Sequence, residues 1–267
     1  MDREDIKYLV FDVESVPDGK LIKLIKYPDD EITEDEAVVR FQNEILEITD
    51  GKSNFIPPTF QYPICVVIAK VDEKFELKEI VSLDEGNFSP EEMTRKFWYG
   101  IEVLYKKASL VTFNGRGFDV PLLELMGYRY GFNMSRHFTD KYGTRYRFGT
   151  RHIDLQEYLS NYNATKMAGG LNLLAKVLGL PGKMETSGEQ VYEMHRDGKM
   201  KEINDYCIHD VLDTYFVFLR TRVNLGKLSQ EDELKLYNAA RQYMLKDSSH
   251  SDAYSIYMEK MSSPMTL

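Results

Sequence analysis

The chain has 267 residues, of which 43% are hydrophobic and 12% aromatic, and it carries a formal net charge of −9. This composition is typical of a globular protein, and the absence of a run of 18 apolar residues predicts no membrane-spanning helix. The excess of acidic residues argues against a protein that coats nucleic acid non-specifically, because such proteins are basic.

The cysteines and the N-terminal stretch argue against a disulfide-rich, zinc-binding or secreted protein. Cys65 and Cys207 are too few for a disulfide framework, and they lack the C-x-x-C spacing of a zinc knuckle. Residues 1–10, MDREDIKYLV, carry acids where a signal peptide has basic residues, and they lack a long apolar region. We therefore expect a cytoplasmic protein that does not contact a membrane.

The first part of the chain is expected to form strands interrupted by one polar insertion. The apolar residues 6–12 predict a strand, and the acidic, mixed residues 18–58 indicate an insertion after it. Within that insertion, residues 33–48 place apolar side chains at helical spacing. The β-branched residues of 62–72 and the alternation of 74–83 predict a hairpin.

Helices dominate after the hairpin. Ser89 as N-cap and Pro90 at the first helical position predict a helix over 89–108. The later elements are expected to be a buried strand over 109–115, a helix over 118–131, a polar loop over 132–151, a strand edge and helix over 152–162, and helices over 169–182, 187–198 and 200–223. This order favours an α/β fold, with a mixed sheet flanked by helices.

We expect one domain over residues 1–225, followed by a helical tail over residues 226–267. The tail is rich in Met and in polar residues, so it is compatible with packing on the domain and with binding a protein partner.

Four acidic residues stand at the ends or on the faces of the expected elements. Asp12 and Glu14 follow the first strand, and residues two apart point to the same face of an extended chain. Asp119 stands where a strand turns into a helix, and Asp210 lies on the long helix of 200–223. Tyr206 precedes Asp210 by four residues and so shares its helix face.

Carboxylates gathered in one place raise each other's pKa or destabilise the fold unless a cation neutralises them. Mg²⁺ and Mn²⁺ prefer carboxylate and water oxygens, and they complete their shells with phosphate. Two such ions about 4 Å apart stabilise the attacking and leaving oxygens of a phosphoryl displacement. The expected ligands of two Mg²⁺ or Mn²⁺ ions are Asp12, Glu14, Asp119 and Asp210. The phenol of Tyr206 can orient the attacking water.

The motifs FDVES, FNGRGFD and YCIHD resemble the three exonuclease motifs of the DEDD, or DnaQ-like, 3′–5′ exonucleases. The Tyr-x-x-x-Asp spacing of the third motif resembles the tyrosine (DEDDy) subgroup, which includes the proofreading domains of family B DNA polymerases. HIDLQEYL and GLNLLAKVLGLPGK are similar to further segments of that family, and the resemblance covers roughly residues 6–220. A free-standing chain of this length resembles the predicted exonucleases related to that proofreading domain.

The resemblance implies a ribonuclease H-like fold, dependence on Mg²⁺ or Mn²⁺, and release of nucleoside monophosphates from a 3′ end. The metal-binding acids of the family correspond to Asp12, Glu14, Asp119 and Asp210. Tyr206 corresponds to the residue that orients the attacking water. Asn114 and Phe118 correspond to positions that approach the terminal nucleotide.

Three polar residues near these motifs have simpler interpretations. Asp154 in HIDL is interpreted as a helix cap rather than a metal ligand. His209 is interpreted as a helix side chain without a catalytic role, because the histidine of the other DEDD subgroup lies five residues before the Asp, where this chain has Asp205. Lys183 is compatible with a phosphate contact and equally with a solvated side chain.

The loop over residues 136–151 interleaves basic and aromatic residues. Aromatic faces stack on bases and cations follow phosphates, so we predict that Arg145 and Arg147 bind substrate. The alternative is an exposed loop packed by its own aromatic side chains. The residues concerned are Arg136, Lys141, Arg145, Arg147 and Arg151, with Phe138, Tyr142, Tyr146 and Phe148.

The expected substrate is single-stranded nucleic acid with a free 3′ end, namely DNA. Two alternatives stay open from the sequence. The first is a 3′–5′ exoribonuclease, because discrimination between DNA and RNA depends on contacts to the 2′-OH. The second is a non-catalytic nucleic-acid-binding module that uses residues 227–267 as a partner surface.

Overall fold

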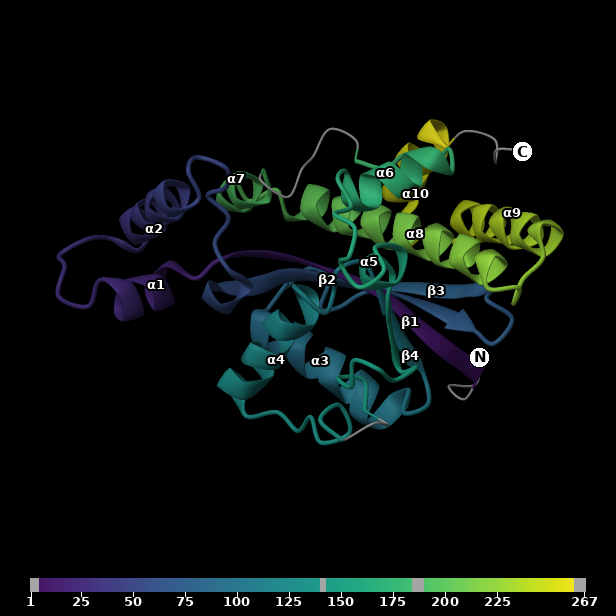
Figure 1. Cartoon of the computed structure of the whole chain (residues 1–267), viewed down its shortest axis with the longest axis horizontal. Coiled ribbons are helices and arrows are strands. Elements are labelled where there is room, and N and C mark those ends of the chain that lie inside the picture. The colour runs from purple at the N-terminus through teal and green to yellow at the C-terminus, as the bar shows by residue number, and fades with distance from the viewer. Residues whose placement is uncertain (1–4, 140–142, 184–189, 262–267) are drawn as a thin grey trace.

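The computed structural model describes residues 5–139, 143–183 and 190–261. In these residues a five-stranded mixed sheet of order β3-β2-β1-β4-β5 lies between two layers of helices (Figure 1). The strands are β1 (Ile6–Pro17), β2 (Gln61–Asp72), β3 (Leu77–Ser82), β4 (Ser109–Thr112) and β5 (His152–Asp154). The central strand β1 runs antiparallel to β2 and parallel to β4. The α/β, ribonuclease H-like fold expected from the sequence is therefore confirmed.

One face of the sheet is covered by two helices that flank β4 in the sequence. Leu9 and Phe11 of β1 point to this face, whereas Val10 between them points to the other, as the period of a strand requires. Trp98 lies buried here and donates its indole N–H to the carbonyl of Leu123 at 2.9 Å. The covering elements are α3 (Pro90–Tyr99), its π-helical continuation η3 (Gly100–Leu104) and α4 (Asp119–Tyr130).

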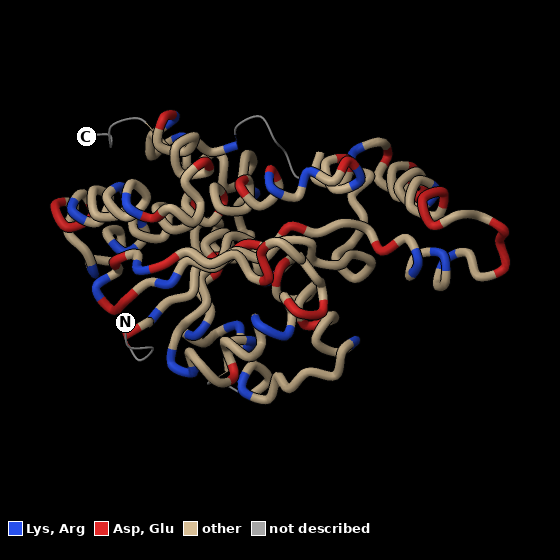
Figure 2. The backbone as a smooth tube through the Cα atoms, turned by 180° about the vertical axis from the view of Figure 1, so that it is seen from behind, with Lys and Arg blue, Asp and Glu red and all other residues tan. Residues whose placement is uncertain are grey.

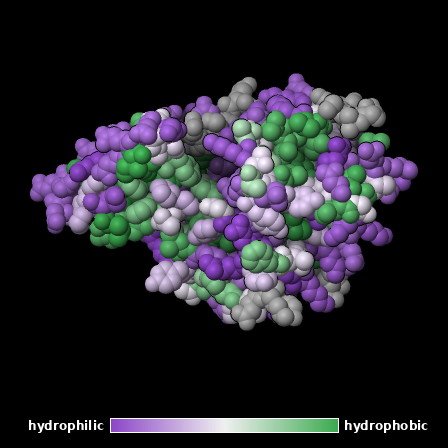
Figure 3. Space-filling model, in the orientation of Figure 1, coloured by the Kyte–Doolittle hydropathy of each residue, from purple (hydrophilic) through white to green (hydrophobic). Residues whose placement is uncertain are grey.

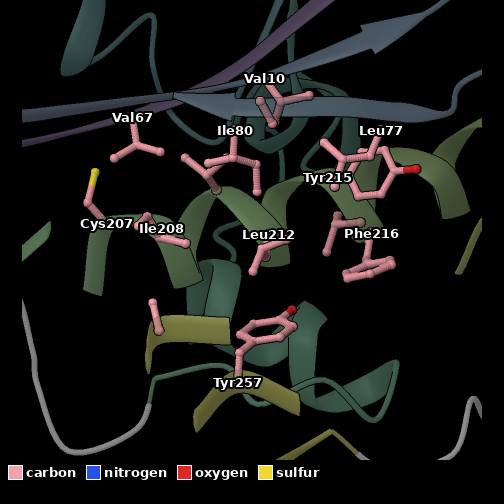
Figure 4. Close-up of a cluster of buried hydrophobic side chains, with 14 of the residues drawn as sticks. Val10, Val67, Leu77, Ile80, Cys207, Ile208, Leu212, Tyr215, Phe216 and Tyr257 are labelled. Carbon is pink, nitrogen blue, oxygen red and sulfur yellow. The ribbon is translucent and has the colours of Figure 1, made fainter. Parts of the chain in front are cut away.

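The opposite face packs against the long helix α8 (Met200–Asn224). Figure 4 shows side chains of this helix, among them Ile208 and Leu212, between Val10 and Val67 of the sheet and Tyr257 on the far side. The sheet covers one side of α8 and other helices cover the other side. The helix therefore carries buried apolar side chains around most of its circumference. Those helices include α6 (Gly170–Val177), α9 (Gln230–Lys246) and α10 (Ser251–Lys260). The short helices α5 (Leu155–Leu159) and α7 (Val191–Arg196) complete the chain order.

The described part of the C-terminal tail packs on the body of the protein. Tyr243 of α9 accepts a hydrogen bond from the backbone N–H of Ile80 at 2.9 Å. His209 of α8 donates its Nε2–H to the carbonyl of Ala253 in α10 at 2.8 Å. The division of domain and tail near residue 225, and a partner surface on the tail, stay predictions.

A buried carboxyl group lies in the contact between α8 and α10. The phenol of Tyr257 donates a hydrogen bond to Oδ1 of Asp213 at 2.7 Å, and Asp213 is 1% exposed. Burial raises the pKa of Asp213 to about 8, because the charged form loses its hydration. The folded protein therefore binds this proton more tightly than the unfolded chain does.

This difference in proton binding predicts a pH-dependent stability effect. The Asp213 contribution should decline as the pH rises from about 4, its unfolded pKa, to about 8. Asp213→Asn keeps an acceptor for Tyr257 and cannot ionise, so it should stabilise the fold at pH 8 by about 1 kcal/mol or more. Thermal melts at pH 5 and pH 8 measure the difference, with the exposed Asp252→Asn on α10 as control. Identical pH profiles of wild type and Asp213→Asn would contradict the assignment.

The insertion forms an arm, residues 19–58, that projects from one end of the sheet (Figure 1). The arm contains α1 (Gly19–Lys26) and α2 (Glu34–Ile48), and the short 3₁₀ turn η2 (Pro58–Phe60) leads back to the sheet. The helix expected over residues 33–48 is confirmed, and Thr33 and Glu36 form a capping box at its start. The arm has its own small core of Ile22, Tyr27, Ala37, Val38, Phe41 and Ile56.

Several expected boundaries were wrong. The first strand continues to Pro17 rather than ending at Asp12, because its acidic residues still pair with β2. The helix α1 was not foreseen; it is short, and Asp18 caps it by accepting from the N–H of Leu21. The helix expected over 89–108 ends at Leu104, and those expected over 169–182 and 187–198 are shorter. Residues 187–189 lie outside the described residues. None of the described helices is long and apolar enough to cross a membrane.

Candidate active site

The site forms where β1 runs beyond the end of β4. β1 pairs with β4 only from Tyr8 to Val10, whereas its pairing with β2 continues to Pro17. Past that point, Asp119 at the start of α4 takes the place of a strand partner, and its Oδ1 accepts from the N–H of Val13 at 3.1 Å. The carboxylate of Asp119 is thereby held at the backbone N–H of Val13, the residue between Asp12 and Glu14 in the sequence.

The helix α8 brings a second set of side chains to the same place. Cys207 lies against β1, where its thiol is 3.5 Å from the carbonyl oxygen of Asp12 and 3.7 Å from its carboxylate. On the adjoining face of the helix lie Tyr206, next to Cys207, and Asp210 one turn further on, and the phenol of Tyr206 is close enough to lower the pKa of the Asp210 carboxyl. Potential ligand atoms of Asp12, Glu14 and Cys207 all lie within 4.8 Å of one another.

The four acids perturb each other electrostatically. Burial raises the pKa values of Asp12 and Glu14 well above the usual range, and the neighbouring carboxylates raise them further. Burial raises the pKa of Asp119 to about 7. Burial likewise raises the pKa of Asp210 to about 6, with the nearby phenol of Tyr206 and the charge of Lys183 acting in the opposite direction. The structure thus brings together the four acids expected from the sequence, in a place where their negative charge is poorly hydrated.

These residues fit a hard divalent cation. Carboxylate oxygens are the ligands that Mg²⁺ and Mn²⁺ prefer, and a cation would remove both the repulsion and the burial cost of the acids. Cys207 fits such a cation poorly, because a cysteine sulfur is a soft donor and Mg²⁺ and Mn²⁺ prefer the hard oxygens of carboxylates and water. The acids of β1, α4 and α8 therefore form an oxygen-donor set, with Cys207 as a neutral hydrogen-bond donor to Asp12.

The turn between β4 and α4 lies beside the acids and is held by Asp154. Asn114 adopts the left-handed conformation with φ of 63°, which Asn tolerates better than most residues. The carboxylate of Asp154 accepts from the N–H of Asn114 at 3.0 Å and from that of Arg116 at 2.9 Å. The same carboxylate caps α5, as expected from the sequence, by accepting from the N–H of Gln156. Asp154 therefore links the cap to the turn that carries Asn114.

Glycine is required in this turn because of a close approach. A Cβ atom on Gly115 would lie 2.4 Å from Oγ1 of Thr112, which is far inside a normal contact. That hydroxyl is already bound at 2.8 Å to Nε2 of the buried His152. The NGRG sequence thus permits the chain to fold tightly between the strand and the acid-bearing helix.

A groove of about 740 Å³ adjoins the acids on the side of the arm. Its lining includes Glu14 of the acid set, Asn114 and Phe118 of the turn before α4, Phe55 of the arm and Tyr192 of α7. We name it the arm groove. The two residues expected to approach the terminal nucleotide therefore do line a space that reaches Glu14.

Arg145 and Arg147 are not in this groove. Arg145 pairs with Glu124 at 2.9 Å and stacks on Phe138, and Arg147 pairs with Glu157 at 2.9 Å. Both arginine side chains are more than half exposed, and a role in substrate binding stays a prediction. Basic residues occur along several loops on the side of the sheet that α3 and α4 cover (Figure 2). Lys141 and Tyr142 of the same loop lie outside the described residues.

Two other residues considered from the sequence are also placed. The ring of His209 is buried against α10, away from the acids, which agrees with its interpretation as a helix side chain. Lys183 is close enough to Asp210 to lower the pKa of that carboxyl. A phosphate contact of Lys183 stays a prediction.

Sequence reasoning missed Cys207 and Phe55. Cys207 stands beside Tyr206 on α8, and helical spacing from Asp210 was the available signal for its place in the site. No local pattern connects Phe55 with the acids, because the insertion carries it there only when folded.

A comparison with protein families gives a match to a family described as a predicted 3′–5′ exonuclease related to the exonuclease domain of PolB, over residues 53–261. The matched region contains Asp119, Tyr206 and Asp210 and begins after β1. A search of curated proteins found no match. Because the match spans most of the chain and the fold is ribonuclease H-like, the protein belongs to this family of predicted 3′–5′ exonucleases related to the exonuclease domain of PolB.

Proposed function

We propose that the protein hydrolyses phosphodiester bonds from the 3′ end of single-stranded DNA and releases nucleoside monophosphates. The observation that carries the proposal is the convergence of four buried or half-buried acids, all with raised pKa values, in which neighbouring carboxylates raise the pKa values of Asp12, Glu14 and Asp119 further. Lys183 is the basic neighbour that offsets part of this cost at Asp210, and cations that accompany a phosphate substrate would offset the rest. The proposed ligands of two Mg²⁺ or Mn²⁺ ions are Asp12, Glu14, Asp119 and Asp210.

When bound, two such ions would polarise the scissile phosphate and lower the pKa of a bound water. The residues of the chain supply the positioning. Asp119 holds its orientation through the N–H of Val13, and Asp154 holds the turn that presents Asn114 to the groove. Phe118 offers a half-buried aromatic ring at the groove wall, where a terminal base can stack.

Tyr206 is the proposed water-orienting residue, which would place the protein in the tyrosine subgroup. Burial and the neighbouring acids raise the pKa of its phenol far above its ordinary value. The phenol therefore stays protonated at neutral pH and acts as a hydrogen-bond donor. Its contact with Asp210 holds the hydroxyl beside the acids.

The test uses a single-stranded oligonucleotide labelled at its 5′ end and incubated with Mn²⁺ or Mg²⁺. A ladder of products shortened from the 3′ end is expected, together with free nucleoside monophosphates. Strand binding without turnover in either metal would overturn the proposal and favour a binding module. A matched RNA strand digested in parallel shows whether the enzyme discriminates against the 2′-OH.

Tyr206→Phe should reduce kcat on single-stranded DNA by about 10²-fold, since it removes only the hydroxyl that positions the water. KM should change little, because the ring stays in place. The matched control is Tyr237→Phe, which alters a tyrosine of α9. A Tyr206→Phe enzyme with wild-type kcat would exclude the phenol from the reaction.

A further inference from the structure

The arm contributes a wall to the groove that opens on the acids. Ile56 is 2% exposed within the small core of the arm, whereas its neighbour Phe55 is 55% exposed. The burial of Ile56 thus fixes the backbone from which the side chain of Phe55 extends toward the groove. Figure 3 shows hydrophobic side chains gathered on the arm, beside the hollow between the arm and the body.

This wall is anchored to the strand that carries the acids. Gln61 donates its Nε2–H to the carbonyl of Ile56 at 2.5 Å, and its Oε1 accepts from the hydroxyl of Ser15 at 2.6 Å. Gln61 is 4% exposed, so water does not weaken these two bonds. The position of Phe55 relative to Glu14, the neighbour of Ser15, is therefore set by buried hydrogen bonds.

Two aromatic rings lie in contact in the lining of the groove. The centroids of Phe55 and Phe118 are 5.8 Å apart with an angle of 48° between the ring planes. Phe118 belongs to the turn held by Asp154, and Phe55 to the arm, so each ring has its own support. The exposed ring of Phe55 and the half-buried ring of Phe118, beside the proposed metal-binding acids, offer faces on which bases stack without regard to sequence.

Charge sets the direction in which a strand would leave the groove. Lys52 lines the outer part of the groove with a 79% exposed side chain, and its 3.8 Å pair with the exposed Asp50 is weak. The tip of the arm is acidic, through Asp29, Asp30 and Glu31 (Figure 2). Phosphates are therefore attracted past Phe55 toward Lys52 and repelled from the tip.

We propose that Phe55 of the arm is a base-stacking residue of the arm groove, beside Phe118, for the 3′-terminal nucleotides of a single strand. This rests on the proposed exonuclease function and adds a residue of the arm to its substrate site. The volume of about 740 Å³ lies within the ~300–1,000 Å³ of sites for single small ligands, so the groove has room for the terminal nucleotides of a strand. The arm thereby adds a stacking surface beside the turn that carries Phe118.

The test compares Phe55→Ala with wild type in binding and in turnover. Fluorescence anisotropy with a labelled single-stranded oligonucleotide, in Ca²⁺ in place of Mg²⁺, should show about tenfold weaker binding by Phe55→Ala. KM should rise by a similar factor with kcat nearly unchanged, because Phe55 does not touch the acids. Phe55→Trp should restore both values, and the melting temperature should stay constant because the ring is exposed.

The matched control is Tyr128→Ala, which removes an 82% exposed aromatic ring of α4 outside the groove. It should leave binding and KM at wild-type values. Unchanged Kd and KM in Phe55→Ala, with an active wild type, would overturn the groove proposal and leave the exonuclease function intact. A wild type that binds strands without cleaving them would overturn the function, and the Kd of Phe55→Ala would still decide the role of the groove. A wild type that binds no strand would overturn both.

Discussion

Asp12→Asn is expected to abolish exonuclease activity and to raise the melting temperature of the metal-free protein. Activity should fall by at least about 10³-fold, because the loss of one carboxylate removes several kcal/mol of charge stabilisation in the reaction. Stability should rise, because the amide ends the repulsion between Asp12 and the carboxylates of Asp119 and Asp210. Ladder assays with Mn²⁺ and thermal melts in EDTA measure the two effects on one preparation.

The opposite signs of these effects separate a functional acid from a structural one. Asp205→Asn is the matched control, since Asp205 is an acid of α8 paired with Lys201 at 3.0 Å on the surface. This control should keep full activity and gain no stability. A destabilised, inactive Asp12→Asn would show that the acid supports the fold, and an active variant would exclude Asp12 from the site.

Mg²⁺ or Mn²⁺ is expected to raise the melting temperature of the wild-type protein. A ligand at 100 times its Kd contributes about 2.7 kcal/mol to the free energy of unfolding. For a chain of this size that corresponds to a shift of about 5–10 °C. The physical reason is the cost of gathering Asp12, Glu14 and Asp119 without a cation, which the ion removes only in the folded state.

The melts should be run at constant ionic strength, with NaCl replacing the divalent salt in the reference. The shift should vanish in Asp12→Asn and persist in Asp205→Asn, because only the first variant loses a proposed ligand. An equal shift in both variants would locate the bound ions elsewhere. Saturating Mn²⁺ without any shift in wild type would contradict the interpretation of the acids as a cation site.

Local patterns were sufficient for most elements of the sheet and for the principal helices. The β-branched run of β2, the cap at Ser89 and the apolar spacing of α8 are signals that act within a few residues. Errors arose where distant contacts override local preference. β1 continues through Asp12 and Glu14 because β2 supplies backbone partners, although acidic residues are rare in strands.

The sequence predicted which residues belong to the candidate site, but not the hydrogen bonds that hold them in place. Motif order and spacing indicated the four acids and Tyr206, because a strand end and a helix face place side chains by simple geometry. The role of Asp154 in holding Asn114 depends on hydrogen bonds between residues 40 positions apart. Such a contact leaves no periodic trace in the sequence.

The sequence by itself determined the α/β class and the order of the elements apart from α1, and it predicted the acids of the candidate site, since each follows from the spacing and type of nearby residues. Only the tertiary structure decided that Cys207 lies on Asp12 and that Asp119 binds the backbone of β1. It also decided that the arm turns Phe55 toward Phe118. These contacts depend on how separate elements pack, and packing is governed by the burial of surfaces that are distant in the chain.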